Sequence, residues 1–290
     1  MVEFRPYDEE LRHFRPGDSE YDHTRNQALE LGLMLHTATA FNLDSHLPFV
    51  PFRYVSELRD TNPPCFLLIY RGDNLETLFS VIMAHARDSQ PSPSKAFRLR
   101  LAVALARAVF SLHRTGYVHG GLTTDNIFLR PDRDADSVAP LIAGFEVARP
   151  KDGHTNKLDV TDRDHILYLH PSRLPGGIAK DSNYPPYDLC GLGVVLLEIG
   201  LWAPLRHMTG MRKASDAVRR VKVYKASEQL SRTMGLEYHN MVKYCLQGYV
   251  TDARAPASSA ASDVRGSSFG TPNAAEVIAR LEPLLSLSEH

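Results

Sequence analysis

Residues 117–129 read YVHGGLTTDNIFL, an apolar approach followed by a polar turn and an apolar exit. This order predicts a short strand, a tight loop and a second short strand. Gly120 and Gly121 lie where the backbone must bend sharply, and glycine tolerates such bends best. A loop of this kind can hold side chains over a cleft, so the flanking sequence decides whether it carries chemistry.

The composition is that of an ordinary globular protein, with 43% hydrophobic and 23% charged residues in a chain of 290. The chain is long enough for one large domain or two small lobes. Its formal net charge is -1, so no overall field attracts nucleic acid or an anionic membrane. We therefore expect other proteins as partners and no nucleic acid.

The three cysteines lie far apart in apolar contexts, at Cys65, Cys190 and Cys245. This usage is typical of buried free thiols in a reducing compartment. The first residues are too charged for a signal peptide. The longest apolar run, residues 192–202, contains Glu198 and is about half as long as a bilayer-spanning helix. These features predict a cytoplasmic protein without a transmembrane segment.

The first quarter of the chain predicts a small mixed lobe. Residues 1–23 form a polar N-terminal segment that we expect to be partly extended or loosely docked. Apolar residues at helical spacing predict a helix over 24–40. Two apolar runs, 51–58 and 65–70, flank the turn-forming sequence RDTNPP and predict a strand hairpin. The small lobe is thus expected over residues 24–70.

Residues 71–290 predict a mainly helical lobe, which makes the fold class α+β. The most periodic run, 97–112, has apolar residues at close to every fourth position. Residues 187–202 are apolar nearly all round, which is typical of a helix buried in a helical lobe. Residues 251–270 are small and polar and predict a flexible insertion. Thr271, followed by a proline, is expected to cap a last helix.

A basic run lies between residues 212 and 225 and alternates with valines and a tyrosine. This alternation predicts the solvated face of an amphipathic helix, in preference to a patch for a partner. The basic residues are Arg212, Lys213, Arg219, Arg220, Lys222 and Lys225.

Several landmarks follow one another in the order found in protein kinases. After the long helix come HGGLTTDN at 119–126, GFE at 144–146, HPS at 170–172, and Asp188 with Gly193 at the start of the apolar helix. The chain therefore resembles the C-terminal lobe of protein kinases, where the matching segments read H-R-D-L-x-x-x-N and D-F-G. More narrowly, it is similar to the kinase-like domains of fungal proteins related to the HeLo and heterokaryon-incompatibility group. The resemblance implies a protein-kinase-like fold with a truncated N-terminal lobe.

The positions that carry kinase chemistry are changed. In kinases the loop Asp accepts the proton of the substrate hydroxyl and the Asp of D-F-G binds magnesium, whereas Gly121 and Gly144 stand here. Asn126 matches the second metal ligand, but one amide is a weak site for a hard dication. No G-x-G-x-x-G occurs and no V-A-I-K strand precedes the first helix, which leaves Glu30 without a lysine partner. We expect no catalytic residue, no bound metal and no cofactor.

The remnants of the kinase pattern are His119, Asn126, Phe145, Glu146 and Asp188. For His119 we expect a structural role as a satisfied core histidine. Asp188 is expected to bind the loop backbone, to cap its helix, or both. Asp125 and Glu146 are near enough in sequence to replace the lost acids, but a shift of two to four residues usually turns a side chain elsewhere. Both are expected to be solvated acids on the rim of the loop.

The resemblance and its departures together predict a pseudokinase, a catalytically impaired kinase-like domain that serves as a signalling scaffold or regulatory interaction module. The alternative is an ATP-binding, serine/threonine-kinase-like phosphotransferase with non-standard metal and base residues. It would hold ATP and Mg²⁺ in a cleft lined by Tyr70, Gly72, Asn126 and Glu146. A third hypothesis is that the chain is a fragment of a longer protein. The sequence names neither a partner nor an oligomeric state.

Overall fold

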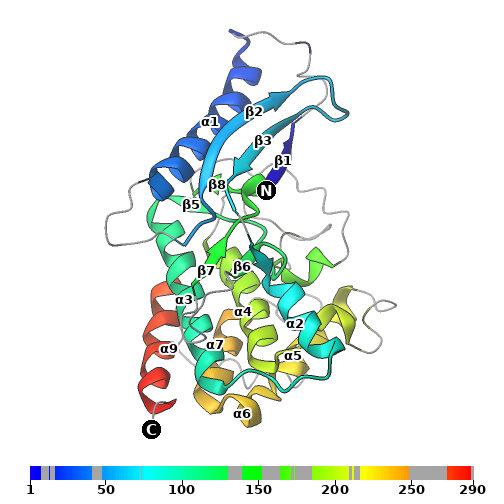
Figure 1. Ribbon diagram of the computed structural model, residues 1–290, viewed down its shortest axis with the longest axis vertical. Helices are drawn as coiled ribbons and strands as arrows, with labels where there is room; N and C mark the ends of the chain where they lie inside the picture. Colours follow the sequence, from blue (N-terminus) through cyan, green and yellow to red (C-terminus); the bar gives the residue numbers. More distant parts are fainter. Residues whose placement is uncertain are drawn as a thin grey trace, which may run out of the picture.

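The computed structural model describes residues 1–7, 13, 17–40, 48–72, 74–129, 139–151, 164–170, 173, 185–208, 211, 216–247 and 273–288. Over these residues the fold is mixed α+β, as the sequence predicts. A three-stranded sheet with one long helix forms one end of the molecule, and a helical layer forms the other (Figure 1).

The sheet at the N-terminal end has the strand order β1-β3-β2, and both of its pairings are antiparallel. Its strands are β1 (Val2–Pro6), β2 (Phe52–Leu58) and β3 (Cys65–Tyr70). The β2–β3 hairpin is the one that the sequence predicts. In β3 the side chains of Phe66, Leu68 and Tyr70 are buried, whereas Leu67 and Ile69 are half-buried. This period of two shows that one face of the sheet is covered better than the other.

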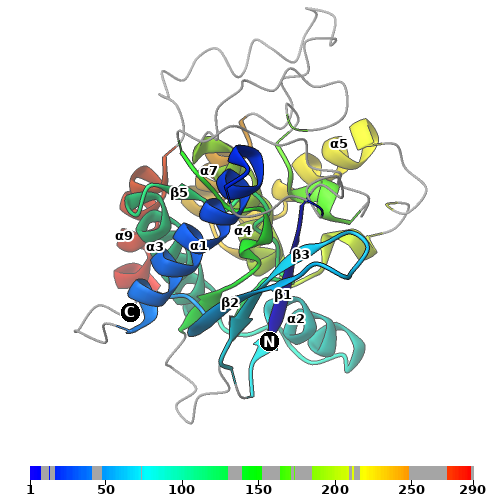
Figure 2. The same cartoon turned by 90° about the horizontal axis from the view of Figure 1, so that it is seen from above.

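Helix α1 (Ser19–Ala40) covers the buried face and runs beside β2 (Figure 2). Leu31 and Leu35 on α1 are fully buried. Gly32 brings the helix close to the sheet, because a Cβ there would lie 2.5 Å from Cγ2 of Val55. The helix predicted from residue 24 is therefore present and begins five residues earlier.

The N-terminal segment differs from its prediction. Residues 2–6 form an edge strand of the sheet, where a loosely docked segment was expected. Along β1, Val2 and Phe4 are exposed while Arg5 is buried, so polar and apolar residues alternate as in a strand with one covered face. The sequence did not reveal the strand because its pairing partner, β3, lies 59 to 67 residues further along the chain.

The other end of the molecule is built from helices around α4. They are α2 (Leu78–Arg87), α3 (Lys95–Arg114), α4 (Pro185–Leu201), α5 (Asp216–Ser227), α6 (Leu230–Thr233), α7 (Leu236–Cys245) and α9 (Ala274–Ser288). Every residue of α4 from 188 to 200 is buried, as its apolar sequence predicts. Helix α3 contacts both α4 and α9, and α9 also contacts α7. These contacts form the main hydrophobic core, which continues into the sheet.

Helix α9 begins later than predicted. Oδ1 of Asn273 accepts a hydrogen bond from the Glu276 backbone N–H at 2.9 Å, which makes Asn273 the N-cap. The expected cap, Thr271, and the expected insertion at 251–270 lie outside the described residues.

Helix α5 contradicts the prediction of a uniformly solvated basic face. Arg219 is buried, and its Nε donates to the Met211 carbonyl at 2.8 Å. Val218 and Val221 are exposed in its place. A long guanidinium stem can reach an internal carbonyl, which a helical pattern alone does not reveal. Residues 212–213 of the basic run lie outside the described part of the chain.

The two strands of the 117–129 stretch are present but do not pair with each other. β5 (Tyr117–Val118) pairs with β8 (Arg149–Pro150), and β6 (Ile127–Leu129) lies between β4 (Glu76–Thr77) and β7 (Pro140–Ile142). Gly120 has a φ of +79°, as the sharp bend requires, whereas Gly121 does not lie in the left-handed region.

All three cysteines are free and buried, as predicted. None of the helices in the described part of the chain combines the length and apolar character needed to cross a bilayer.

Candidate functional site

The loop after β5 is held by a buried carboxylate on α4. The two oxygens of Asp188 accept hydrogen bonds from the backbone N–H groups of His119 and Gly120, both at 2.7 Å. Nε2 of His113, at the end of α3, lies 2.9 Å from the same carboxylate. Burial by itself opposes ionisation, but the hydrogen bond and charge of His113 lower the pKa of Asp188. Of the roles considered for Asp188, the structure has it binding the loop backbone.

His119 has both ring nitrogens occupied. Nδ1 accepts from the Gly121 backbone N–H at 3.2 Å, which requires that Nε2 carry the proton that it donates to the Ala143 carbonyl at 2.8 Å. The ring is buried and lies 5.1 Å from the ring of Phe145. His119 thus joins the loop to the segment after β7.

Asn126 is also committed to the loop itself. Its Oδ1 accepts from the Thr123 N–H at 2.9 Å, and its Nδ2 donates to the Gly121 carbonyl at 2.6 Å. Gly144 lies directly against this amide, because a Cβ at Gly144 would lie 2.5 Å from Nδ2 and 2.6 Å from Cβ of Asn126. Gly144 also has a φ of +84°. No side chain fits at position 144 unless Asn126 moves.

A carboxylate from the first strand reaches this point. Oε1 of Glu3 accepts from the Gly144 N–H at 2.5 Å, and Oε2 accepts from the Phe145 N–H at 2.9 Å. The Tyr70 hydroxyl donates to Oε2 at 2.8 Å. Burial, helped by the negative charge of Glu146, raises the pKa of Glu3 to about 7. Glu3 therefore bridges the sheet and the start of the short 3₁₀ helix η2 (Phe145–Val147).

Arg5 makes the same connection with the opposite charge. Its Nη1 donates to the carbonyls of Phe145, Glu146 and Ala148, at 3.3, 3.2 and 3.0 Å. Burial, with the nearby charge of Arg149, lowers the pKa of Arg5 to about 9. Nη1 of Arg5 thus bonds to backbone carbonyls of η2 and of the residue that follows it.

Sequence reasoning missed both Glu3 and Arg5. The available signal was the order VEFRP, in which charged and apolar residues alternate at the period of a strand. Five residues are too few to distinguish this alternation from an irregular polar segment. The partners of the two side chains lie about 140 residues further along the chain.

Asp125 pairs with an arginine on the helical side of the loop. Its Oδ1 accepts from Nη2 of Arg206 at 2.8 Å, and the Arg206 guanidinium lies 3.2 Å from the centre of the Phe79 ring. Arg206 belongs to the 3₁₀ helix η5 (Leu205–His207). Asp125 therefore lies in an ion pair, whereas the sequence predicted a solvated acid on the rim.

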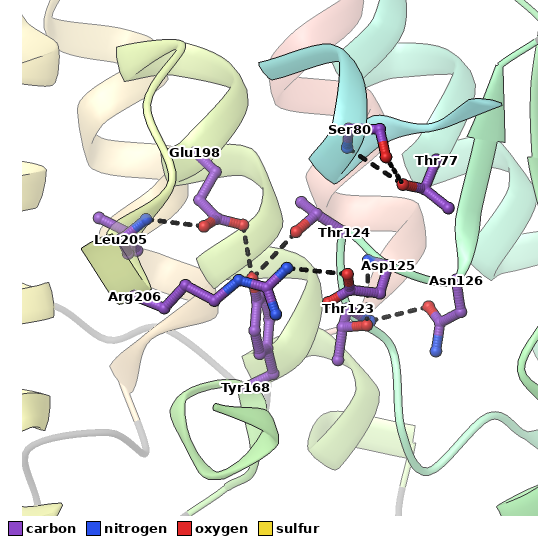
Figure 3. A network of polar contacts seen from close by, with 10 residues as sticks. All are labelled: Thr77, Ser80, Thr123, Thr124, Asp125, Asn126, Tyr168, Glu198, Leu205 and Arg206. Atoms are coloured by element: carbon purple, nitrogen blue, oxygen red, sulfur yellow. Dashed lines mark hydrogen bonds and ion pairs between the residues drawn. The ribbon is translucent and has the colours of Figure 1, made fainter. Parts of the chain in front are cut away.

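The buried acid Glu198 on α4 belongs to the same group of polar contacts as Asp125 and Arg206 (Figure 3). Oε2 of Glu198 accepts from the Tyr168 hydroxyl at 2.7 Å, and Oε1 accepts from the Leu205 N–H at 2.8 Å. The Thr124 hydroxyl lies 3.0 Å from that of Tyr168, the last residue of η3 (His165–Tyr168). Burial raises the pKa of Glu198 to about 7, although each of these donors favours its ionised form. Through Tyr168, Thr124 in the loop is therefore connected to Glu198 on α4.

Two of the four residues expected to hold a nucleotide have side chains that already bond within the protein. Tyr70 is buried with its hydroxyl on Glu3, and Asn126 is occupied within the loop. Gly72 packs against Leu75, whose Cδ1 would lie 2.5 Å from a Cβ at this position. Glu146 is the one acid among these four residues, and its side chain is half-buried. Of the HPS segment, only His170 is described, and its ring lies 5.0 Å from that of Tyr187.

No group of three or more His, Cys, Asp or Glu side chains suited to a metal ion occurs within the described ranges. In comparisons with known proteins, no family model matches the chain and no curated protein matches it significantly. The candidate site therefore has to be interpreted from its own geometry.

Proposed function

We propose that this chain is a catalytically impaired domain of the protein-kinase-like class that acts by binding other proteins, as a signalling scaffold or regulatory module. The kinase landmarks identified in the sequence support this proposal, and so do the bonds that hold them. Asp188, His119 and Asn126 all make hydrogen bonds that keep the loop in shape. Each of these three side chains would have to give up a hydrogen bond within the protein before it could bind a substrate hydroxyl.

The observation that carries the proposal is the placement of the Glu3 carboxylate on the Gly144 and Phe145 amides. In an active kinase the Asp at the position of Gly144 binds the magnesium ions that neutralise the phosphates. Here position 144 is filled by contact with Asn126, and an acid from β1 takes the adjacent backbone donors. An ionised Glu3 would also repel a triphosphate at this place.

One observation favours the alternative, an ATP-binding kinase with unusual ligands. Glu146 lies near enough to Glu3 to raise its pKa, and two carboxylates that repel each other are potential partners for a shared cation. Under this hypothesis Glu146 would bind Mg²⁺ with the nucleotide, and Glu3 would have to release Gly144.

Thermal unfolding with and without ATP and MgCl₂ tests the proposal. We expect no change in Tm up to millimolar nucleotide, because the polar groups around Gly144 already have partners. A real site would stabilise the protein by about 2.7 kcal/mol at a hundredfold excess over Kd. A shift of that size would contradict the proposal in its present form.

Matched variants identify the site if such a shift occurs. Glu146→Gln should abolish the magnesium-dependent part of the shift, because it removes the accessible acid. Glu76→Gln, at an exposed position on β4, should leave the shift unchanged. Transfer of labelled phosphate to a generic substrate, lost in Glu146→Gln, would then be needed to establish a kinase.

A further inference from the structure

Among the described strands, β1 has one neighbour in its sheet. It pairs with β3 on one side, and no described strand pairs with its other side. In Figure 1, β1 lies at the end of the sheet opposite to β2. An edge strand with free backbone groups is a template for another strand, unless charges, proline or a covering element protect it.

The hydrogen bonds at both ends of β1 reveal which residues face the outer edge. The Tyr70 N–H donates to the Met1 carbonyl at 3.0 Å, and the Met1 amino group donates to the Tyr70 carbonyl at 3.4 Å. At the other end, the Tyr7 N–H donates to the Pro64 carbonyl at 3.0 Å. Bonded and non-bonded pairs alternate along an antiparallel ladder, so the odd-numbered residues of β1 bond to β3.

The even-numbered residues therefore direct their backbone groups outward. Val2 and Phe4 offer an N–H and a carbonyl each, and Pro6 offers a carbonyl alone. Their side chains share the sheet face that α1 does not cover, with Val2 45% and Phe4 57% exposed. This edge thus presents both hydrogen-bonding groups and apolar side chains. Its charged residues, Glu3 and Arg5, are turned to the inner face, and its proline is the last residue of the strand.

We propose that the outer edge of β1 binds β1 of a second copy of this chain, so that the two sheets join into one of six strands. This inference names a partner for the interaction module proposed above, but it does not depend on the absence of nucleotide binding. The two strands would run antiparallel about a twofold axis. The bound strand must supply donors and acceptors at the same spacing, and a second β1 supplies them.

Charge determines the register. Pairing Phe4 with Phe4 of the other copy places Glu3 opposite Arg5 on the inner face. Moving one strand by two residues in either direction would place Glu3 opposite Glu3 or Arg5 opposite Arg5. Like charges directly opposite each other are unfavourable. In the favoured register the Phe4 pair exchanges two hydrogen bonds and brings two aromatic rings together. Each Val2 N–H also meets a Pro6 carbonyl.

The whole chain offers little resistance to this association. Its formal net charge is -1, so two copies repel each other weakly. The contact is small, with five residues from each strand. We therefore expect a weak dimer with a Kd on the order of 100 µM.

Sedimentation velocity over a concentration series tests the dimer. The unmodified chain should shift from monomer to dimer, and Phe4→Lys should weaken association at least tenfold. Tyr54→Lys is the matched control, because Tyr54 is 55% exposed on the same sheet face but belongs to β2. Both substitutions are at exposed sites, and unchanged Tm values would verify that the variants fold.

Cross-linking tests the register. A short bis-maleimide should join two chains of Phe4→Cys and should leave Tyr54→Cys monomeric, since the three native cysteines are buried. A chain that stays monomeric at about 1 mM, tenfold above the expected Kd, overturns the proposal. Equal weakening by Phe4→Lys and Tyr54→Lys would also overturn it, because the contact would then be the sheet face instead of the edge.

Discussion

At the scale of single residues, Gly144 shows how a position can be fixed by what surrounds it. Its backbone has a φ of +84°, and the Asn126 amide occupies the space that a side chain would need. The sequence shows a glycine at this position, where the kinase pattern has an acid. It does not show that the surrounding structure leaves no space for a side chain.

We predict that Gly144→Ala destabilises the protein by about 3 kcal/mol. A positive φ costs an L-residue about 1–2 kcal/mol, and forcing a Cβ into a packed site costs about 1–3 kcal/mol more. Gly116→Ala is the control, because Gly116 has a φ of +85° with nothing within 4 Å of the added Cβ. It should lose about 1–2 kcal/mol in urea unfolding. Equal losses in the two variants would mean that Asn126 does not fill the site.

At the scale of elements, the predicted loop depends on α4 for its shape. The loop contains two glycines and has no strand pairing of its own between β5 and β6. Asp188 supplies acceptors for two consecutive backbone N–H groups, and Glu198 holds the other side through Tyr168. The sequence predicted the loop, the helix and a role for Asp188. It left Glu198 unassigned, because its partners come from three separate segments.

Asp188→Asn should destabilise the protein by about 3 kcal/mol, because an amide offers one acceptor oxygen where the carboxylate offers two. Its NH₂ group would face a backbone N–H that needs an acceptor. Hydrogen exchange should accelerate at the amides of His119 and Gly120, while the amides in the middle of α4 stay protected.

Asp88→Asn provides the control for this change. Asp88 is an exposed acid that pairs with Arg87 at 2.9 Å, and because water screens this pair its loss should leave the free energy of unfolding nearly unchanged. If His119 and Gly120 exchange no faster in Asp188→Asn than in Asp88→Asn, the carboxylate does not hold the loop.

At the scale of the whole molecule, β1 links the sheet to the helical layer. Glu3 and Arg5 together make five hydrogen bonds to backbone groups between residues 144 and 148. This link joins a strand of five residues to a segment about 140 residues further along the chain. Within the described residues, it involves only the inner side chains of β1 and leaves the outer backbone groups for the pairing proposed above.

Arg5→Met should cost about 2 kcal/mol, because the aliphatic stem is kept while the bonds to three carbonyls are lost. The only tryptophan, Trp202, lies in the helical layer next to Phe97 and reports its unfolding. In the unmodified chain, fluorescence and far-ultraviolet circular dichroism should change together. In Arg5→Met, the circular dichroism should begin to change before the Trp202 fluorescence, because α1 and the sheet would unfold before the helical layer.

Arg53→Met, at an exposed position on neighbouring β2, should change stability by no more than about 0.5 kcal/mol. Coincident transitions in Arg5→Met with no loss of stability would show that the two layers are held together without Arg5.

The sequence by itself determined the elements with a strong period. The apolar run of α4, the regular spacing of α3 and the β2–β3 hairpin all follow from which residues must avoid water. It also determined the order of loop, strand and buried helix that underlies the kinase resemblance. These features depend on neighbours within one element, and periodicity records such neighbours directly.

Only the tertiary structure decided which polar groups meet. Glu3 reaches Gly144, Arg5 reaches Ala148 and Asp125 reaches Arg206, across separations of 141, 143 and 81 residues. A buried polar group must find a partner, but any segment of the chain can supply it. For this reason the sequence could show glycines at positions 121 and 144, where the kinase pattern has acids, while only the packed molecule shows which groups lie around them.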